Sequence, residues 1–361
     1  MIRVGALKDE TYTEVKAFSF RGRLLPRSSL ETLAESRGIE DLVVRLKATQ
    51  YNEAVSTISS PYRVEKLEMA FREHLVSAHS RLMGTWPRSG LLRAYYLKHI
   101  VWNLKSILKG KAMNLAEEDI SRNINLTAEE NLRRRDVIVK ALSAGSLEAA
   151  IESLAKTEFE SNVSTAFQLY SKTMDTRIFD MFLDKSLFEM ILSEYKKLES
   201  NNRISISKSE SDRVRDIVAL DIDGYNVINL LRAKMWELTQ PQIREILIES
   251  SFDIPSRTIA KMVATDSISE AIKFIGSTPY RGMVQDAGED SDNIATLESA
   301  FEFQGYKAAF KSFRWQVVGH GLVLGITRLM ELEVKNLSAI AFGVEQGLSD
   351  REIEAKLTFL F

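Results

Sequence analysis

The sequence has no cysteine among its 361 residues. This excludes a disulfide scaffold, a thiolate metal site and a cysteine nucleophile. Neither sign of charge dominates, because 48 Lys and Arg stand against 50 Asp and Glu. A general nucleic-acid-binding protein would carry a strong basic excess instead. An apolar share of 45% excludes a disordered chain, and this length predicts roughly two or three domains.

Long hydrophobic runs are also missing. The longest uncharged stretch covers residues 315–327, between Arg314 and Arg328. A membrane-spanning helix needs about 20 consecutive apolar residues, and the N-terminal residues lack the apolar segment of a signal peptide. We therefore expect a soluble, intracellular chain with no inserted membrane segment.

Signals for β-strands are few. The one convincing apolar run is residues 217–220, and residues 203–207 alternate only weakly. We therefore predict an all-α fold, with loops near 58–62, 84–90, 200–212 and 284–294. Within the last loop, residues 286–292 are acidic and contain glycine, so we expect that loop to be mobile.

Internal repeats are the most informative feature of what is present. Three segments, beginning at Ile39, Leu147 and Ile268, end in threonine, any residue, an aromatic residue, three residues and valine. In each segment the residues ten, six and three positions before the threonine are apolar, which predicts one buried helix face. The three triplets are Thr49/Tyr51/Val55, Thr157/Phe159/Val163 and Thr278/Tyr280/Val284.

A second repeated element begins at Asn103, Asn226 and Asn336, with a shorter version from Phe20. Each copy reads as a helix, a short break and a second helix. In two copies a capping box opens the second helix: Thr239 with Gln242, and Ser349 with Glu352. The pattern predicts helix–turn–helix building blocks that pack through their apolar faces.

A third element places a long helix upstream of each asparagine, around Leu67, Phe188 and Leu297. The chain begins inside one such unit and stops inside another. We therefore expect the last, incomplete copy to pack beside the first. This gives three similar helical domains around a closed pseudo-threefold axis, formed by residues 1–62 with 334–361, 63–184, and 185–333.

An aspartate pair offers an enzyme hypothesis. Residues 217–226 resemble motif I of the haloacid-dehalogenase superfamily, in which Asp221 would be the phosphoryl-accepting nucleophile, Asp223 a general acid or base, and Mg²⁺ the cofactor. Tyr225 departs from that motif, the alternating strands of such a sheet are missing, and the other copies lack the Asp pair. We favour a helix cap at Asp221 or Asp223 and keep a Mg²⁺-dependent phosphatase as the alternative.

The four histidines do not predict a metal site. His74 and His79 are five residues apart, whereas ligands on one helix face are three or four apart. We expect His74, His79, His99 and His320 to be surface or half-buried side chains.

Two further motifs have structural interpretations. Gly319-x-Gly321-x-x-x-Gly325 matches no phosphate loop, and we interpret it as close helix packing or a kinked helix. The basic run 133–135 is typical of a solvated helix face. We therefore predict no catalytic, cofactor-binding or metal-binding residues.

The repeats give the chain a family resemblance. The segments RGRLLPRSSLETLAESRGIEDLVVRLKATQYNEAV, NVINLLRAKMWELTQPQIREILI and ELEVKNLSAIAFGVEQGLSDREIEAKL resemble the C subunits of archaeal A-type (V/A-type) ATP synthases and their relative, the d subunit of the vacuolar ATPase. The resemblance runs from about residue 12 to the C-terminus, with departures at Trp236 and in 286–292. It implies a funnel of three similar helical domains.

The resemblance also implies a function. Members are non-catalytic central-rotor subunits, present in one copy per complex at the cytoplasmic face of the membrane. Their wide part seats on the membrane proteolipid ring and their socket receives the central-stalk shaft, so that torque couples ion translocation to ATP synthesis or hydrolysis. We name Lys109, Lys111, Arg232 and Lys234 as candidates for lining the socket, or alternatively as solvated helix ends. A helical-repeat scaffold with unrelated partners is the other alternative.

Overall fold

The computed structural model describes residues 2–201, 208–250, 252–285, 293–314 and 319–360. The fold is 75% helical, and these described ranges contain no strand, which confirms the all-α prediction. The β-like run 217–220 instead lies inside a long helix, α14 (Lys208–Met235). A short apolar run cannot distinguish a buried strand from a buried helix segment. The weak alternation at 203–207 and the acidic residues 286–292 lie outside the described residues.

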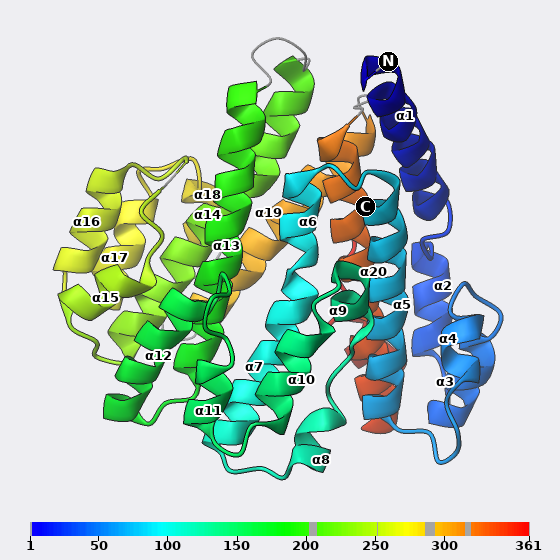
Figure 1. The fold of residues 1–361 in the computed structure, drawn as a ribbon. Helices are drawn as coiled ribbons and strands as arrows, with labels where there is room; N and C mark the ends of the chain where they lie inside the picture. Colours follow the sequence, from blue (N-terminus) through cyan, green and yellow to red (C-terminus); the bar gives the residue numbers. More distant parts are fainter. Residues whose placement is uncertain (1, 202–207, 251, 286–292, 315–318, 361) are drawn as a thin grey trace. The chain divides into compact units, whose positions relative to one another are not determined.

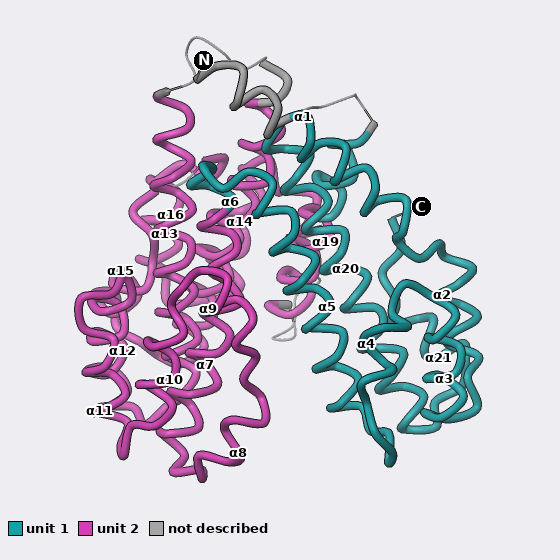
Figure 2. Tube along the Cα trace, turned by 45° about the vertical axis from the view of Figure 1, so that its right-hand side comes forward, with its two compact units in different colours: residues 1–92, 306–361 teal, residues 93–305 magenta. Residues whose placement is uncertain are grey.

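The chain forms two compact units, residues 1–92 with 306–361 and residues 93–305 (Figure 2). We call them unit 1 and unit 2. The limits between the units, at residues 92/93 and 305/306, fall within two helices, α6 (Gly90–Tyr96) and α19 (Asn293–Arg314). The three-domain division expected from the repeats stays a prediction.

Unit 1 joins the two ends of the chain. Its helices are α1 (Ile2–Arg21), α2 (Arg27–Ala34), α3 (Ile39–Leu46), α4 (Asn52–Ser56), α5 (Val64–Thr85), α20 (His320–Glu345) and α21 (Asp350–Glu354). Helices α5 and α20 lie side by side (Figure 1). One buried core combines Leu42, Leu46 and Phe71 with Leu337 and Ile340. Each such side chain contributes roughly 1.5–3 kcal/mol on full burial, so the N- and C-terminal segments stabilise one another.

Unit 2 holds the middle of the chain. Its helices are α7 (Lys98–Ala112), α8 (Glu117–Ser121), α9 (Thr127–Leu132), α10 (Arg135–Ser143), α11 (Leu147–Glu152), α12 (Glu160–Thr173), α13 (Arg177–Asn201), α14, α15 (Gln240–Ile246), α16 (Ser256–Ala264), α17 (Ile268–Ile275) and α18 (Arg281–Gln285). Helix α13 packs against α7, α12 and α14. Expected loops near 58–62 and 84–90 are present between α4 and α5 and between α5 and α6.

The break after each asparagine helix has the same geometry in α7, α14 and α20. The eleventh residue after the asparagine is left-handed, with φ of 53° at Asn114, 55° at Glu237 and 67° at Gly347. The next N–H then donates to the carbonyl five residues back, as in a Schellman motif. These bonds are Leu115 to Gly110 (2.9 Å), Leu238 to Ala233 (3.0 Å) and Leu348 to Gly343 (2.9 Å).

The second helix of each block begins as predicted at both capping boxes. The Ser349 N–H donates to Glu352 Oε2 at 2.9 Å, and the Glu352 N–H donates back to Ser349 Oγ at 3.4 Å. At Thr239 the backbone N–H donates to Gln242 Oε1 at 2.8 Å. These bonds satisfy N–H groups that a helix start leaves without intrahelical partners.

Candidate functional site

The threonine of each repeat forms a turn of the same geometry in all three copies. Its hydroxyl donates to the carbonyl three residues back and accepts the N–H of the aromatic residue two positions on. The donated bonds measure 2.7 Å at Thr49, 2.6 Å at Thr157 and 2.7 Å at Thr278. The accepted bonds measure 3.1 Å from Tyr51, 3.3 Å from Phe159 and 3.2 Å from Tyr280. This turn buries the aromatic ring in all three copies. The valine is buried in two copies, whereas Val284 is only half-buried.

The asparagine that begins each repeated segment is buried and pairs with the backbone 22 residues later. We call this arrangement the asparagine clamp. The side-chain Oδ1 accepts an N–H from Asn125 (3.2 Å), Ile248 (2.8 Å) or Thr358 (2.9 Å). The Nδ2 group donates to the carbonyl of the same residue, at 2.7, 3.2 and 3.0 Å respectively. The clamp thereby supplies hydrogen bonds to loop backbone that lies outside any helix.

Two of the three copies add a buried carboxylate three residues before the asparagine. The Tyr51 hydroxyl donates to Glu333 Oε1 at 2.8 Å, and the Tyr280 hydroxyl donates to Asp223 Oδ2 at 2.9 Å. In the remaining copy Ile100 and Phe159 occupy the two positions. The repeat pattern did not lead us to predict this pairing, although the matched spacing of Asp223 and Glu333 before their asparagines was a signal for it.

Asp221 and Asp223 form neither a phosphatase centre nor a helix cap. Both lie inside α14, which begins at Lys208, so the proposed strand and helix start are both wrong. Residues two apart on a helix do not face each other. Asp221 accepts the Tyr95 hydroxyl at 2.7 Å, whereas Asp223 accepts the N–H groups of Phe252 (3.0 Å) and Asp253 (2.8 Å). The carboxylates therefore serve separate packing contacts.

Burial raises the pKa of Asp223, although the N–H groups of Phe252 and Asp253 and the Tyr280 hydroxyl favour its ionised form. Burial likewise raises the pKa of Glu333 to about 7. Glu333 accepts hydrogen bonds from the Leu25 N–H, Tyr51 and Gln50, the last at 2.6 Å. Each carboxylate joins its helix to distant loops of the same unit.

The middle copy places a carboxylate elsewhere. Glu129 of α9 is fully buried, and its Oε1 accepts Asn103 Nδ2 at 2.6 Å. In the next copy the corresponding Nδ2, of Asn226, donates to the Ser250 carbonyl instead, at 3.0 Å. Burial raises the pKa of Glu129 to about 7. Both copies therefore keep the asparagine clamp, but the additional acceptor of the Nδ2 group is a carboxylate in one and a backbone carbonyl in the other.

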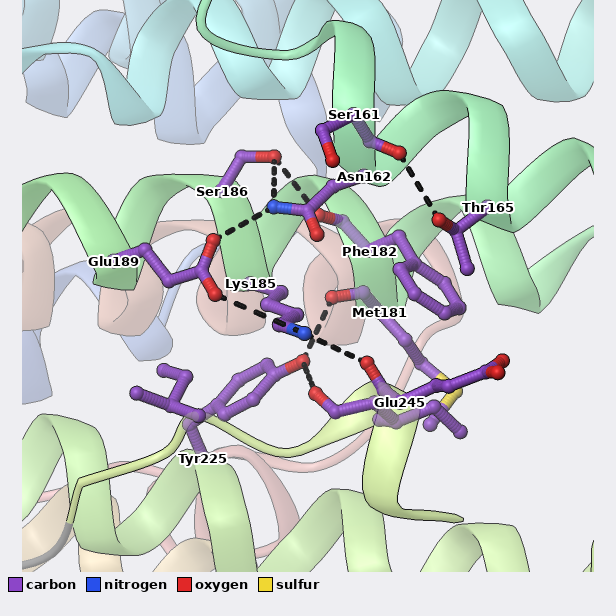
Figure 3. Close-up of polar contacts among 12 residues, drawn as sticks. Ser161, Asn162, Thr165, Met181, Phe182, Lys185, Ser186, Glu189, Tyr225 and Glu245 are labelled. Atoms are coloured by element: carbon purple, nitrogen blue, oxygen red, sulfur yellow. Dashed lines mark hydrogen bonds and ion pairs between the residues drawn. The ribbon is translucent and has the colours of Figure 1, made fainter. Parts of the chain in front are cut away.

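A second polar network in unit 2 links α12, α13, α14 and the end of α15 (Figure 3). The Tyr225 hydroxyl shares its proton between the carbonyls of Met181 (3.0 Å) and Ile246 (2.9 Å). Lys185 donates to the Glu245 carbonyl at 2.7 Å, and Asn162 donates to Glu189 Oε2 at 2.8 Å. Tyr225, which departed from the phosphatase motif, therefore holds neighbouring helices together.

The histidines are more buried than predicted. Only His74 is half-buried, and it stacks on Tyr51 with ring centroids 4.5 Å apart. His79, His99 and His320 are buried, so the surface expectation is wrong for these three. His320 Nε2 lies 3.0 Å from Ser89 Oγ, and the ring stacks on Trp86 at 4.1 Å. Aromatic contacts offset part of the cost of burying an imidazole.

The glycine motif serves close packing, as predicted. A Cβ on Gly325 of α20 would lie 2.9 Å from the Ala309 carbonyl oxygen of α19, so only glycine fits there. Gly319 precedes α20 with φ of 85°, and its N–H donates to Glu14 Oε1 at 3.0 Å.

The basic run 133–135 is not one helix face. Arg133 is the left-handed residue between α9 and α10, with φ of 56°. Arg134 pairs with Glu158 through two bonds, one of 2.6 Å, and Arg135 pairs with Glu130 at 3.0 Å. The break was not predicted because left-handed arginines are uncommon.

The four cationic candidates for a socket lining all have partners within unit 2. Lys109 pairs with Asp180 at 3.0 Å and Arg232 pairs with Glu298 at 2.6 Å. Lys111 donates to the Ala144 carbonyl at 2.6 Å, and Lys234 donates to the carbonyls of Val263 (3.1 Å) and Thr265. The matching positions therefore perform matching structural tasks: pairing with a long helix, and binding carbonyls at the end of α10 or α16.

Ligating clusters are missing from the described part of the chain. Within it, no group of three or more His, Asp or Glu side chains could hold a metal ion. Among the same residues, no helix combines the length and apolar character that a bilayer crossing requires.

These contacts define the class of the protein as an all-helical repeat protein whose buried polar groups support the fold. A family model described as "ATP synthase (C/AC39) subunit" matches residues 13–356, and the chain belongs to this family. Family membership confirms the resemblance stated above and the expectation of a non-catalytic role.

Curated relatives agree over nearly the whole chain. The chain is 24% identical to the A-type ATP synthase C subunit of Thermococcus onnurineus, covering 95% of this chain and 88% of the relative. It is 22% identical to the proteins of the same name from Methanocaldococcus jannaschii and Methanosarcina mazei, covering 97% of this chain and 86% and 92% of the relatives.

Proposed function

We propose that this chain is the central-rotor socket of a rotary A-type or V-type ATP synthase. It links the central-stalk shaft to the membrane proteolipid ring and transmits torque between ion translocation and ATP synthesis or hydrolysis. One copy acts in each complex, at the periphery of the membrane on its cytoplasmic face. The observation that carries the proposal is the family match over residues 13–356.

The repeated contacts suit such a task. A torque-transmitting element must deform little under load, and close-packed helices with satisfied interiors resist deformation. Three asparagine clamps and three identical threonine turns each fix a loop to its helix. We further propose that the three copies form similar domains around a pseudo-threefold axis, made of residues 1–62 with 334–361, 63–184, and 185–333.

The lysine and arginine partners refine the proposal. Lys109, Lys111, Arg232 and Lys234 are committed to contacts within the chain. Charge reversal at one of them would therefore weaken unit 2 before it altered a shaft contact. A broad surface, and not these four cations, supplies the affinity for shaft and ring.

Co-purification from detergent-solubilised membranes tests the proposal. The tagged chain serves as bait, the untagged strain is the control, and native mass spectrometry determines the composition of the complex. We expect one copy of the chain with the central-stalk shaft and the proteolipid ring. Recovery with partners that include neither shaft nor ring would support the unrelated-scaffold alternative and contradict the proposal. Recovery of the chain alone would also contradict the proposal, and Mg²⁺-dependent phosphatase activity would then be assayed.

A further inference from the structure

Unit 1 contains a cavity of about 280 Å³ beside the Glu333 and Asn336 contacts described above. It is formed by the end of α1, the turn into α2, one face each of α19 and α20, and residues 358–360. Most of its wall is apolar, for example Leu24, Leu30, Leu329 and Leu332. The backbone of Thr358, at one side, is fixed by the Asn336 clamp.

The charged side chains of the cavity wall differ in whether a polar group already pairs with them. Arg21 and Arg27 line the cavity together with Glu333. The Glu333 carboxylate is already bound by the Leu25 N–H, Tyr51 and Gln50. Arg27 pairs with Glu31 at 2.6 Å.

Arg21 differs from the other charged groups of the wall. Its guanidinium lies over the ring of Phe313, 4.8 Å from the centroid, and over Phe310 at 5.8 Å. Among the described side chains, no carboxylate pairs with it. The rings hold the guanidinium in place by cation–π contact, which engages its face and not its N–H groups.

We propose that this cavity binds a medium-chain alkyl carboxylate, with the chain against the leucines and the carboxylate on Arg21. Arginine binds carboxylates through paired hydrogen bonds that a single-point cation does not offer. Each methylene removed from water contributes about 0.8 kcal/mol. The cavity lies just below the ~300–1,000 Å³ of pockets that enclose drug-sized ligands, so the fitting ligand is small and narrow. The inference does not depend on the proposed rotor function.

Calorimetric titration of the purified full chain tests the site, with decanoate below its micelle concentration as the probe. We expect one decanoate per chain, and weaker binding of decanol and decylamine. Arg21→Gln should weaken decanoate binding at least about tenfold, because the charge-assisted pair is lost. Arg23→Gln is the matched control, since Arg23 is exposed, lies two residues away and does not line the cavity.

A second variant locates the site. Leu329→Trp adds bulk to the wall and should abolish decanoate binding, with folding checked by circular dichroism. If this variant does not fold, Leu30→Phe on the opposite element supplies the same test. Decanoate binding that survives Arg21→Gln, equally tight decylamine binding, or no decanoate binding to the parent chain would each overturn the proposal.

Discussion

The copies of the repeat around α14 and α20 differ from the copy around α7 at one pair of positions. In the first two, a buried carboxylate three residues before the asparagine accepts a tyrosine hydroxyl. In the α7 copy the two positions are occupied by Ile100 and Phe159, which are both buried. Neither side chain has a polar atom. Acid and hydroxyl are present or absent together, because a lone buried hydroxyl or carboxylate would cost more than the pair.

The asparagine clamp, by contrast, is the same in all three copies. Asn103, Asn226 and Asn336 are 2%, 1% and 3% exposed, and each binds both the N–H and the carbonyl of one residue 22 positions later. The comparison separates two kinds of polar contact. The clamp pairs both backbone groups of a loop residue with one side chain, whereas the tyrosine–carboxylate pair joins two side chains to each other and to neighbouring loops.

Replacement of a clamp asparagine should have the largest effect. Asn226→Leu leaves the Ile248 N–H and the Ser250 carbonyl unpaired and removes one of the two donors to the Ile248 carbonyl, and we expect a loss of about 4 kcal/mol in the free energy of unfolding. Urea unfolding measures the loss, and hydrogen exchange should become faster at the Ile248 N–H.

The matched control for that change is Asn229→Leu. Asn229 is also buried in α14, but its side chain donates only to the Tyr225 carbonyl of the same helix, at 3.0 Å. We expect a loss of about 1 kcal/mol. Equal losses for the two variants would contradict the special role of the clamp.

The carboxylate of the α20 copy should make stability depend on pH. Burial raises the pKa of Glu333 from 4.5 to about 7, so the folded chain holds this proton to a higher pH than the unfolded chain. Its stabilising contribution is complete below about pH 4.5 and is lost as the pH rises through about 7, a change of about 3 kcal/mol.

Glu333→Gln should remove this part of the pH dependence, measured as unfolding free energy between those two pH values. Glu129, whose pKa burial also raises to about 7, contributes its own slope, so the difference between variant and parent isolates Glu333. Glu35→Gln, at an exposed position of unit 1, controls for the loss of one carboxylate. A slope that Glu333→Gln leaves unchanged would show that the pKa of Glu333 is the same in the folded and the unfolded chain.

Introducing only the tyrosine of the tyrosine–carboxylate pair into the α7 copy should destabilise the fold. Phe159→Tyr adds a hydroxyl at a fully buried position and should lower the unfolding free energy by about 2 kcal/mol. Ile100→Glu in the same chain supplies an acceptor and should recover part of the loss, as a double-mutant cycle would measure. Additive losses would mean that the two positions are not paired in this copy.

The smallest effects concern the seventh residue after the asparagine. A Cβ on Gly343 would lie 2.6 Å from Ile353 Cγ1, so we expect Gly343→Ala to cost about 1–2 kcal/mol through overpacking. Ala233 occupies the equivalent position in α14 and is fully buried, so Ala233→Gly should cost about 1–2 kcal/mol through helix propensity and the loss of a buried methyl group. A stabilising Gly343→Ala, measured by thermal unfolding, would contradict the close approach.

The sequence predicted the helical class, the repeat and the capping boxes, because each depends on local spacing. The threonine–aromatic signature corresponds to one turn in all three copies. Its aromatic residues are buried as their apolar neighbours predicted.

Long-range contacts could not be predicted in the same way. Asp223 is bound by groups 29, 30 and 57 residues away, and Glu333 by a tyrosine 282 residues away. Their spacing before the asparagines marked the two carboxylates as equivalent, but it did not indicate which distant groups bind them. The apolar residues before Asp221 were compatible with a strand, and only packing on both sides of α14 favoured the helix.

Ion pumping by membrane vesicles tests the central claim, that this chain couples the two halves of a rotary ATPase. Vesicles whose complexes lack this chain should hydrolyse ATP without building an ion gradient, and addition of the purified chain should restore ATP-driven pumping. An ion gradient of parent size in vesicles that lack the chain would contradict the claim.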